Sequence, residues 1–190
     1  EKVNAGFVQI RTTEDLLENT MLAVGVRRND SSNATSKTVW NISGKHNLTD
    51  NLYIQANIGT SFRLPDAEQL FLNEIYDEDN DGVPDDFFSV GNPNLKPEQS
   101  ENINVSIGGS AGRLSWELVG FSREITDYIE SYTTTYIAGV EGESFINTND
   151  QVDIDGFELI TALQLTDTLS ANFSYTDTKA ELNGNGSQLQ

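Results

Sequence analysis

Residues 59–107 read GTSFRLPDAEQLFLNEIYDEDNDGVPDDFFSVGNPNLKPEQSENINVSI, and this stretch decides the fold. An alternating segment, Leu52–Ser61, leads into it, and a second one, Glu101–Gly109, closes it. Alternation of apolar and polar residues is the pattern of a β-strand with two different faces. Nearly forty residues connect the two strands, and they hold all four prolines of the chain. A connection of this length is uncommon in a compact domain and is usually functional or disordered.

The same alternation recurs along the rest of the chain and predicts about eight strands. No segment shows the period of an amphipathic helix. The other expected strands are Ala5–Thr13, Met21–Arg28, Lys37–Asn47, Leu114–Ile129, Phe157–Leu165 and Leu169–Thr176.

The connections between these strands alternate between short and long. Short polar turns are expected near Asp15–Asn19, Thr49–Asn51, Ser110–Arg113 and Thr166–Thr168, and long ones at Asn29–Ser36, Phe62–Ser100 and about Ser131–Phe145. A meander with short turns at one end and long loops at the other is typical of transmembrane β-barrels. A soluble β-sandwich also has strands of period two and is the alternative. Three features favour the barrel: long strands, polar faces rich in Asn, Ser, Gln and Gly, and aromatic residues near strand ends.

Composition excludes several classes of protein. The net charge of −19, from 30 acidic and 11 basic residues, argues against nucleic-acid binding, which needs a basic surface. The chain has no cysteine, so disulfides, thiolate metal sites and a cysteine nucleophile are excluded. No apolar run is long enough for a transmembrane helix. Glu1 follows no leader sequence and the first residues already have a strand pattern, so we expect the chain to begin within a longer protein.

The acidic run in the long connection predicts a calcium site. Asp77, Asp79 and Asp81 occupy relative positions 1, 3 and 5, Gly82 permits the sharp turn, and the Val83 carbonyl follows at position 7. Asp85 is the acid at position 9. Position 12 is Phe88, where an EF-hand has a bidentate Glu, so Asp86 is the substitute ligand. A bound Ca²⁺ would order loop 77–86, whereas the alternative is a solvated acidic loop tip.

Arg63, in the phrase SFRLPD, is the candidate for contact with a ligand, together with Asp66 and Glu68. Its planar guanidinium fits the carboxylates of an anionic ligand. The structural alternative is an ion pair with nearby acids, including Asp66 and Glu68. His46, the single histidine, has no G-x-S-x-G motif to serve, so an enzyme is not expected.

Four phrases, in order, resemble the C-terminal half of TonB-dependent outer-membrane receptors. They are Gly59–Pro65 (GTSFRLP), Gly91–Asn102 (GNPNLKPEQSEN), Asn149–Leu159 (NDQVDIDGFEL) and the turn LTDTLSANFSYT at 165–176. In that family a G-x-x-F-R-x-P phrase ends a strand, a surface loop follows, and G-N-P-x-L-K-P-E leads into the next strand. The resemblance covers most of the chain.

This resemblance implies an all-β fold: an antiparallel meander supplying about eight strands of a 22-stranded barrel in the Gram-negative outer membrane. Residues 1–190 would be a barrel fragment, with the plug domain and final strands absent. The implied function is uptake of a ferric siderophore, cobalamin or glycan, captured by loops 62–100 and 131–147. Implied partners are membrane lipid and lipopolysaccharide, and TonB through the plug. The alternative from another class is a calcium-dependent adhesin or carbohydrate-binding protein, built as a small barrel or sandwich.

Overall fold

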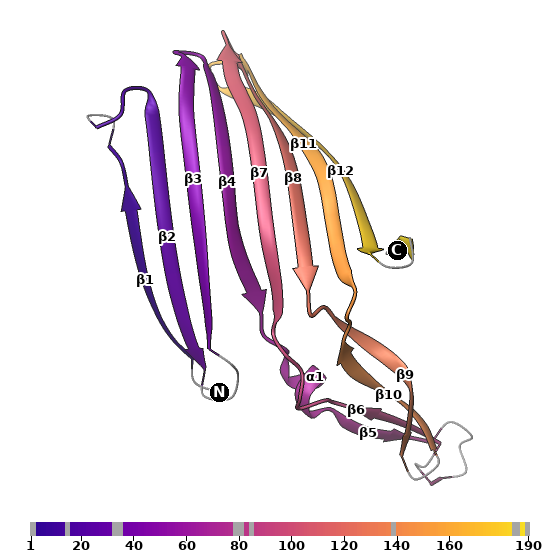
Figure 1. Ribbon diagram of the computed structural model, residues 1–190. Helices are drawn as coiled ribbons and strands as arrows, with labels where there is room; N and C mark the ends of the chain where they lie inside the picture. Colours follow the sequence, from indigo (N-terminus) through magenta and orange to yellow (C-terminus); the bar gives the residue numbers. More distant parts are fainter. Residues whose placement is uncertain are drawn as a thin grey trace.

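The computed structural model describes residues 3–13, 16–31, 36–77, 82–83, 86–137, 140–183 and 187–188. Its main element is one curved sheet of nine strands, in the order β1-β2-β3-β4-β7-β8-β11-β12-β13 (Figure 1). We call its eight long strands the wall: β1 (Val3–Arg11), β2 (Thr20–Ser31), β3 (Lys37–Thr49), β4 (Leu52–Arg63), β7 (Glu98–Ala111), β8 (Leu114–Thr126), β11 (Gln151–Thr166) and β12 (Leu169–Asn183). The ninth, β13 (Ser187–Gln188), pairs with the end of β12. The predicted antiparallel meander and its strand number are confirmed.

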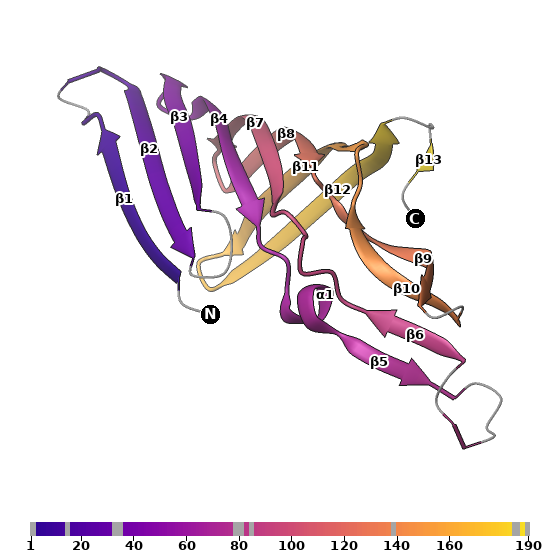
Figure 2. The same ribbon diagram turned by 60° about the horizontal axis from the view of Figure 1, so that its bottom comes forward.

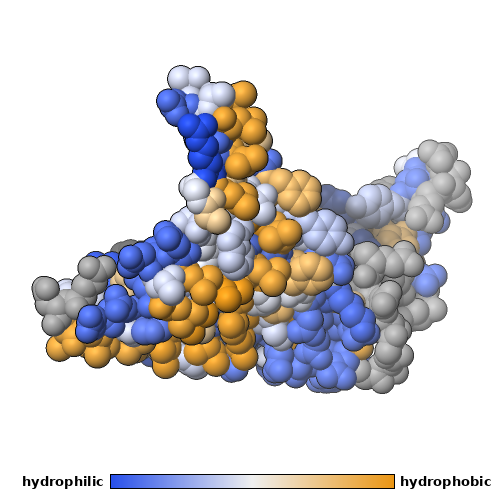
Figure 3. Space-filling view, turned by 90° about the horizontal axis from the view of Figure 1, so that it is seen from above, coloured by the Kyte–Doolittle hydropathy of each residue, from blue (hydrophilic) through white to orange (hydrophobic). Residues whose placement is uncertain are grey.

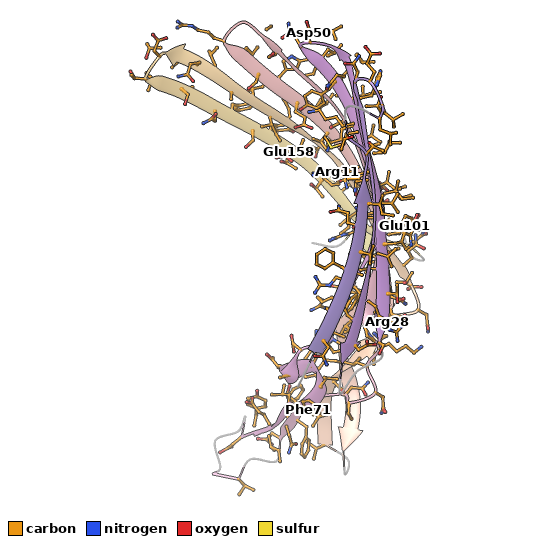
Figure 4. The ribbon with its side chains drawn as sticks, turned by 90° about the vertical axis from the view of Figure 1, so that its left-hand side faces the viewer. Arg11, Arg28, Asp50, Phe71, Glu101 and Glu158 are labelled. Carbon is orange, nitrogen blue, oxygen red and sulfur yellow. The ribbon has the colours of Figure 1, made fainter. Side chains whose placement is uncertain are left out.

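Strand register divides the wall into an apolar and a polar face. Ile42, Ile58 and Ile103 lie side by side across β3, β4 and β7. The neighbouring row is Asn41, Gly59 and Asn102, and it lies on the opposite face because successive side chains alternate. Figure 4 shows the side chains of Arg11 and Glu158 on the concave side and those of Arg28 and Glu101 on the convex side. By this register, Asn41, Gly59 and Asn102 lie on the concave face, as Arg11 and Glu158 do. Ile42, Ile58 and Ile103 lie on the convex face, as Arg28 and Glu101 do.

The apolar convex face is not covered by a second layer. Val24, Ile42 and Val105 are 47%, 45% and 57% exposed. Among the described residues, the buried hydrophobic side chains are those of Ala23, Ile129 and Val152. Seen from the end with the short turns, hydrophobic residues gather on one side of the wall (Figure 3). The sandwich alternative is therefore wrong, since its strands would bury their apolar face. A sheet with an exposed apolar outer face and a polar inner face is a barrel wall.

Gly156 lies where strands β8, β11 and β12 pack closely. A Cβ at this position would lie 2.5 Å from the Phe121 ring on β8 and would overlap the Asp177 carbonyl oxygen on β12. Glycine therefore gives the Phe121 ring its place on the concave face.

Two of the three expected long connections contain regular structure, which the sequence did not predict. Residues 62–100 include α1 (Ala67–Phe71), β5 (Asn73–Tyr76) and β6 (Phe87–Val90), and the later connection includes β9 (Ile129–Ile137) and β10 (Val140–Asn147). The expected strand Leu114–Ile129 is also wrong in its end, because Asp127 adopts a φ of 54° and turns the chain out of the wall. None of the described helices has the length and apolar character needed to cross a bilayer.

These short strands form a second sheet of four strands, in the order β5-β6-β10-β9. We call it the outer-loop sheet. It lies beyond the end of the wall opposite the short turns, next to α1 (Figure 2). Strands β6 and β10 come from different connections and pair in parallel. Both long loops therefore contribute to one structure.

Candidate functional site

The outer-loop sheet begins at an ion pair between the ends of two wall strands. Arg63 ends β4 and Glu98 starts β7, and the two residues are direct cross-strand partners. The Arg63 Nε and Nη2 atoms donate to the two Glu98 carboxylate oxygens at 2.7 and 2.6 Å. The Glu98 side chain is only 9% exposed, and it also accepts a hydrogen bond of 2.9 Å from the Ile129 backbone N–H. Glu98 thus joins β4, β7 and β9 at one point.

Helix α1 follows directly and is held by a capping box. Asp66 accepts from the Gln69 backbone N–H at 2.8 Å, and the Gln69 side chain accepts from the Asp66 N–H at 3.1 Å. Gly91 packs on the C-terminal end of α1, where a Cβ would lie 2.5 Å from backbone atoms of Leu70 and Phe71. Phe71 is 67% exposed and points to the concave side of the molecule (Figure 4). The helix therefore presents an apolar side chain over the interior of the barrel.

Two asparagine side chains, Asn92 and Asn147, bond to the backbone of the other loop, and Asn147 also bonds within its own loop. Asn92 Nδ2 donates to the Phe145 carbonyl at 2.9 Å. Asn147 Oδ1 accepts from the Lys96 N–H at 2.8 Å, and its Nδ2 donates to the carbonyls of Lys96 and Asp127 at 3.0 and 2.7 Å. The bonds from Asn147 satisfy backbone groups of Lys96 and Asp127, which lie outside any strand.

One face of the outer-loop sheet combines carboxylates with aromatic rings. Glu74, Ser89 and Glu143 are neighbours in one row across β5, β6 and β10, and the Ser89 hydroxyl donates to Glu143 at 2.9 Å. In the next row on the same face, Tyr76 lies against Phe87 with ring centroids 6.4 Å apart. The Tyr76 hydroxyl donates to Glu74 at 2.5 Å, and this hydrogen bond raises the pKa of the phenol. The face can receive a ligand with apolar and hydrogen-bond-donating groups.

The concave face of the wall carries a polar network below the loops. Arg123 Nε donates to Asn102 Oδ1 at 2.6 Å, and Asn102 Nδ2 donates to the Ser61 and Ser100 hydroxyls at 3.3 and 3.4 Å. A hollow of about 450 Å³ lies here and is also lined by Asn57 and Asn104. Such a face suits contact with water or a polar partner.

The three residues predicted to contact a ligand have different roles in the structure. Arg63 forms its ion pair with Glu98, which was not among the predicted acids, although the K-P-E phrase contains it. Asp66 caps α1, and Glu68 is an exposed residue of its first turn. Contact of Arg63, Asp66 or Glu68 with a ligand stays a prediction.

The predicted calcium segment lies partly outside the described residues, which omit Asp79, Asp81 and Asp85. Asp77 Oδ2 accepts from the Gly82 N–H at 2.9 Å, and Gly82 has a φ of 91°, which supports the predicted turn. Among the described residues, no group of three or more carboxylate or imidazole side chains is placed to hold a metal ion. The calcium site stays a prediction.

Comparison with known proteins identifies the fold independently. The model of the family "TonB dependent receptor-like, beta-barrel" matches residues 5–190. A vitamin B12 transporter, BtuB of Photobacterium profundum, is 30% identical over 164 residues, which cover 86% of this chain and 24% of that protein. The hemoglobin-haptoglobin utilization protein B of Neisseria meningitidis is 29% identical over 115 residues, covering 60% of this chain and 13% of that protein.

Among solved structures, the siderophore receptor PirA of Pseudomonas aeruginosa superposes with a TM-score of 0.72 at 18% identity. The match covers 95% of this chain and 37% of PirA. The chain thus spans about a quarter of the BtuB relative and over a third of the PirA structure.

Proposed function

Because the chain belongs to the TonB-dependent receptor family, whose members are transporters and not enzymes, we propose that its parent protein captures a scarce nutrient and imports it across the outer membrane. The wall is part of the Gram-negative outer-membrane barrel, with its convex face toward lipid. In this proposal the outer-loop sheet captures the cargo at the cell surface. A plug domain elsewhere in the parent protein gates passage and receives energy through TonB.

The charge of the outer loops supports a neutral or cationic cargo. Residues 64–97 and 127–150 contain fourteen acidic residues and a single basic one, Lys96. Arg63, at the base of these loops, is already paired with Glu98. An anionic ferric siderophore would meet like charge over most of this surface, and repulsion of like charges lowers both association rate and affinity. The acidic residues are Asp66, Glu68, Glu74, Asp77, Glu78, Asp79, Asp81, Asp85, Asp86, Asp127, Glu130, Glu141, Glu143 and Asp150.

We therefore place cobalamin first among the three predicted cargo classes. Cyanocobalamin carries no net charge, and its amide groups can donate hydrogen bonds to the carboxylates of the loops. The similarity to BtuB, a vitamin B12 transporter, supports the same choice. The single observation that carries the proposal is the excess of acidic residues in loops that the structure joins into one sheet.

The test is a growth assay with the full-length gene. A Gram-negative host without its own cobalamin receptor, and dependent on cobalamin for methionine synthesis, should grow on nanomolar cyanocobalamin when the gene is expressed. The same host with tonB deleted should not grow. Parallel hosts lacking receptors for ferric enterobactin or for maltooligosaccharides should gain no growth on those nutrients. Growth on ferric enterobactin alone would overturn the charge argument and leave the transport proposal standing.

A further inference from the structure

The two long loops meet along three pairs of residues in parallel strands. Phe88 lies opposite Gly142, Ser89 opposite Glu143, and Val90 opposite Ser144. The partners are more than fifty residues apart in the chain, and β7 and β8 lie between the two loops in the sequence. A contact between neighbouring loops therefore depends on how their bases are joined.

The Asn147 side chain joins those bases, because it bonds to the Lys96 backbone as the backbone of a neighbouring strand would. Its amide oxygen accepts from the Lys96 N–H while its amide nitrogen donates to the Lys96 carbonyl, so Lys96 has both backbone groups satisfied by one residue. The same nitrogen donates to Asp127, which has a φ of 54° at the turn between β8 and β9. Only a carboxamide combines this acceptor with two donors.

The pairing of β6 with β10 brings groups from both loops together on the outer-loop sheet. Glu74 and Tyr76 belong to the first loop, and Glu143 belongs to the second. They come together only because β6 pairs with β10, and Ser89 bridges the row by donating to Glu143. A cargo that contacts this face contacts both loops.

We infer that Asn147 is a positioning residue for cargo capture, which holds loops 64–97 and 127–150 together as a single body. The inference rests on the proposed function for the cargo, but the joining of the loops is independent of it. Glu98 and Asn92 support the same body through their bonds to Ile129 and Phe145. Loss of the Asn147 amide should free each loop to move alone.

Hydrogen exchange of the full-length protein in lipid nanodiscs tests the joining of the loops without any cargo. In Asn147→Ala, amides of 87–97 should exchange about tenfold faster, in step with those of 127–131, because the bonds that held Lys96 and Asp127 are lost. Asn147→Asp keeps an acceptor for Lys96 but loses both donors, so it should give a smaller increase. Asn149→Ala, an exposed asparagine two residues away, is the matched control and should exchange like the wild type.

A disulfide across the parallel pair provides the rescue. Val90→Cys with Ser144→Cys places two cysteines on directly paired residues, within the spacing that a disulfide spans. In the Asn147→Ala background the oxidised pair should restore slow exchange in both loops, and the reduced pair should not. Faster exchange confined to 140–150 in Asn147→Ala, with 87–97 unchanged, would overturn the inference.

Uptake of radiolabelled cyanocobalamin separates positioning from a general structural defect. Asn147→Ala should raise the half-saturating concentration about tenfold, leave the maximal rate unchanged, and return to wild type when the disulfide forms. Equal half-saturation in both proteins, with the loops shown to be separated by exchange, would contradict the role in capture. Absence of uptake by the wild type as well would count against the proposed cargo, and the exchange result would still decide the joining of the loops.

Discussion

The wall and the outer-loop sheet are both antiparallel in most of their pairings, yet they are stabilised differently. The wall has strands of nine to sixteen residues with long ladders, and most of its side chains need only suit either lipid or the interior, apart from close-packed glycines such as Gly156. The outer-loop sheet has two strands of four residues and depends on named side chains, chiefly Glu98, Asn92 and Asn147. Changes in the wall should therefore affect assembly, whereas changes in the loops should affect local order.

The largest effect is expected from Gly156→Val in the wall. The added side chain would overlap the Asp177 carbonyl and the Phe121 ring, so β11 could not keep its place between β8 and β12. We expect loss of folded barrel, measured as loss of heat-modifiable migration of the full-length protein from outer membranes. The control is Gly120→Ala, where the nearest atom to an added Cβ is 4.0 Å away, and assembly should be normal. Normal assembly of Gly156→Val would show that the strands can separate here.

The second largest effect is expected from a charge on the convex face of β7, compared with the same charge on its concave face. Val105, midway along β7, is 57% exposed on the convex face, and Val105→Arg would place a charge in the hydrocarbon at a cost of about 2–4 kcal/mol. Asn104→Arg, on the concave face beside it, should leave the free energy of unfolding near the wild-type value. Denaturant titration in lipid bilayers measures both. Equal costs would mean that the faces are assigned wrongly.

At the base of the loops, Glu98→Ala should loosen the outer-loop sheet and spare the wall. The substitution leaves Arg63 without its partner and the buried Ile129 N–H without an acceptor, a local cost of about 1–3 kcal/mol, reduced by solvent screening because Arg63 is half exposed. Trypsin should cleave faster after Arg63, as followed by mass spectrometry. Glu101→Ala, on the convex face, is the control. An unchanged cleavage rate in Glu98→Ala would show that the ion pair does not hold the loop.

The smallest effect concerns the calcium prediction. Millimolar Ca²⁺ should slow hydrogen exchange in 77–86 several-fold and leave the wall unchanged, because weak extracellular sites order only their own loop. EDTA should reverse the change, and Asp79→Ala with Asp81→Ala should abolish it. If exchange in the wild-type loop is the same with Ca²⁺ and with EDTA, the segment is a solvated acidic turn.

The sequence was sufficient for the wall because alternation is a local property of each strand. Ile54, Ala56 and Ile58 mark the lipid side of β4 without reference to any other part of the chain. The loops were harder to predict. The capping box at Asp66 and Gln69 is a local sequence signal for the start of α1, but five residues are too few to show a helical period.

The pairing of β6 with β10 depends on residues more than fifty positions apart, and no local pattern encodes it. The Asp127 turn was likewise hidden, because the alternation of β8 continues through Ile129 in the sequence. The ion pair between Arg63 and Glu98 was also not predicted, because the two residues are 35 positions apart in the chain.

The parallel pairing of β6 and β10 also has a consequence for the order of folding. Strands that are separated by two intervening wall strands cannot find each other by closing a short loop, and contacts of such high sequence separation form slowly. Hairpins of the wall, such as β7–β8, need only a turn of two residues. The pairing of β4 with β7 spans similar separations, but it joins twelve pairs of residues, whereas β6 and β10 share three. We therefore expect the outer-loop sheet to form after β4, β7, β8 and β11 are side by side, so that the surface facing the environment folds last.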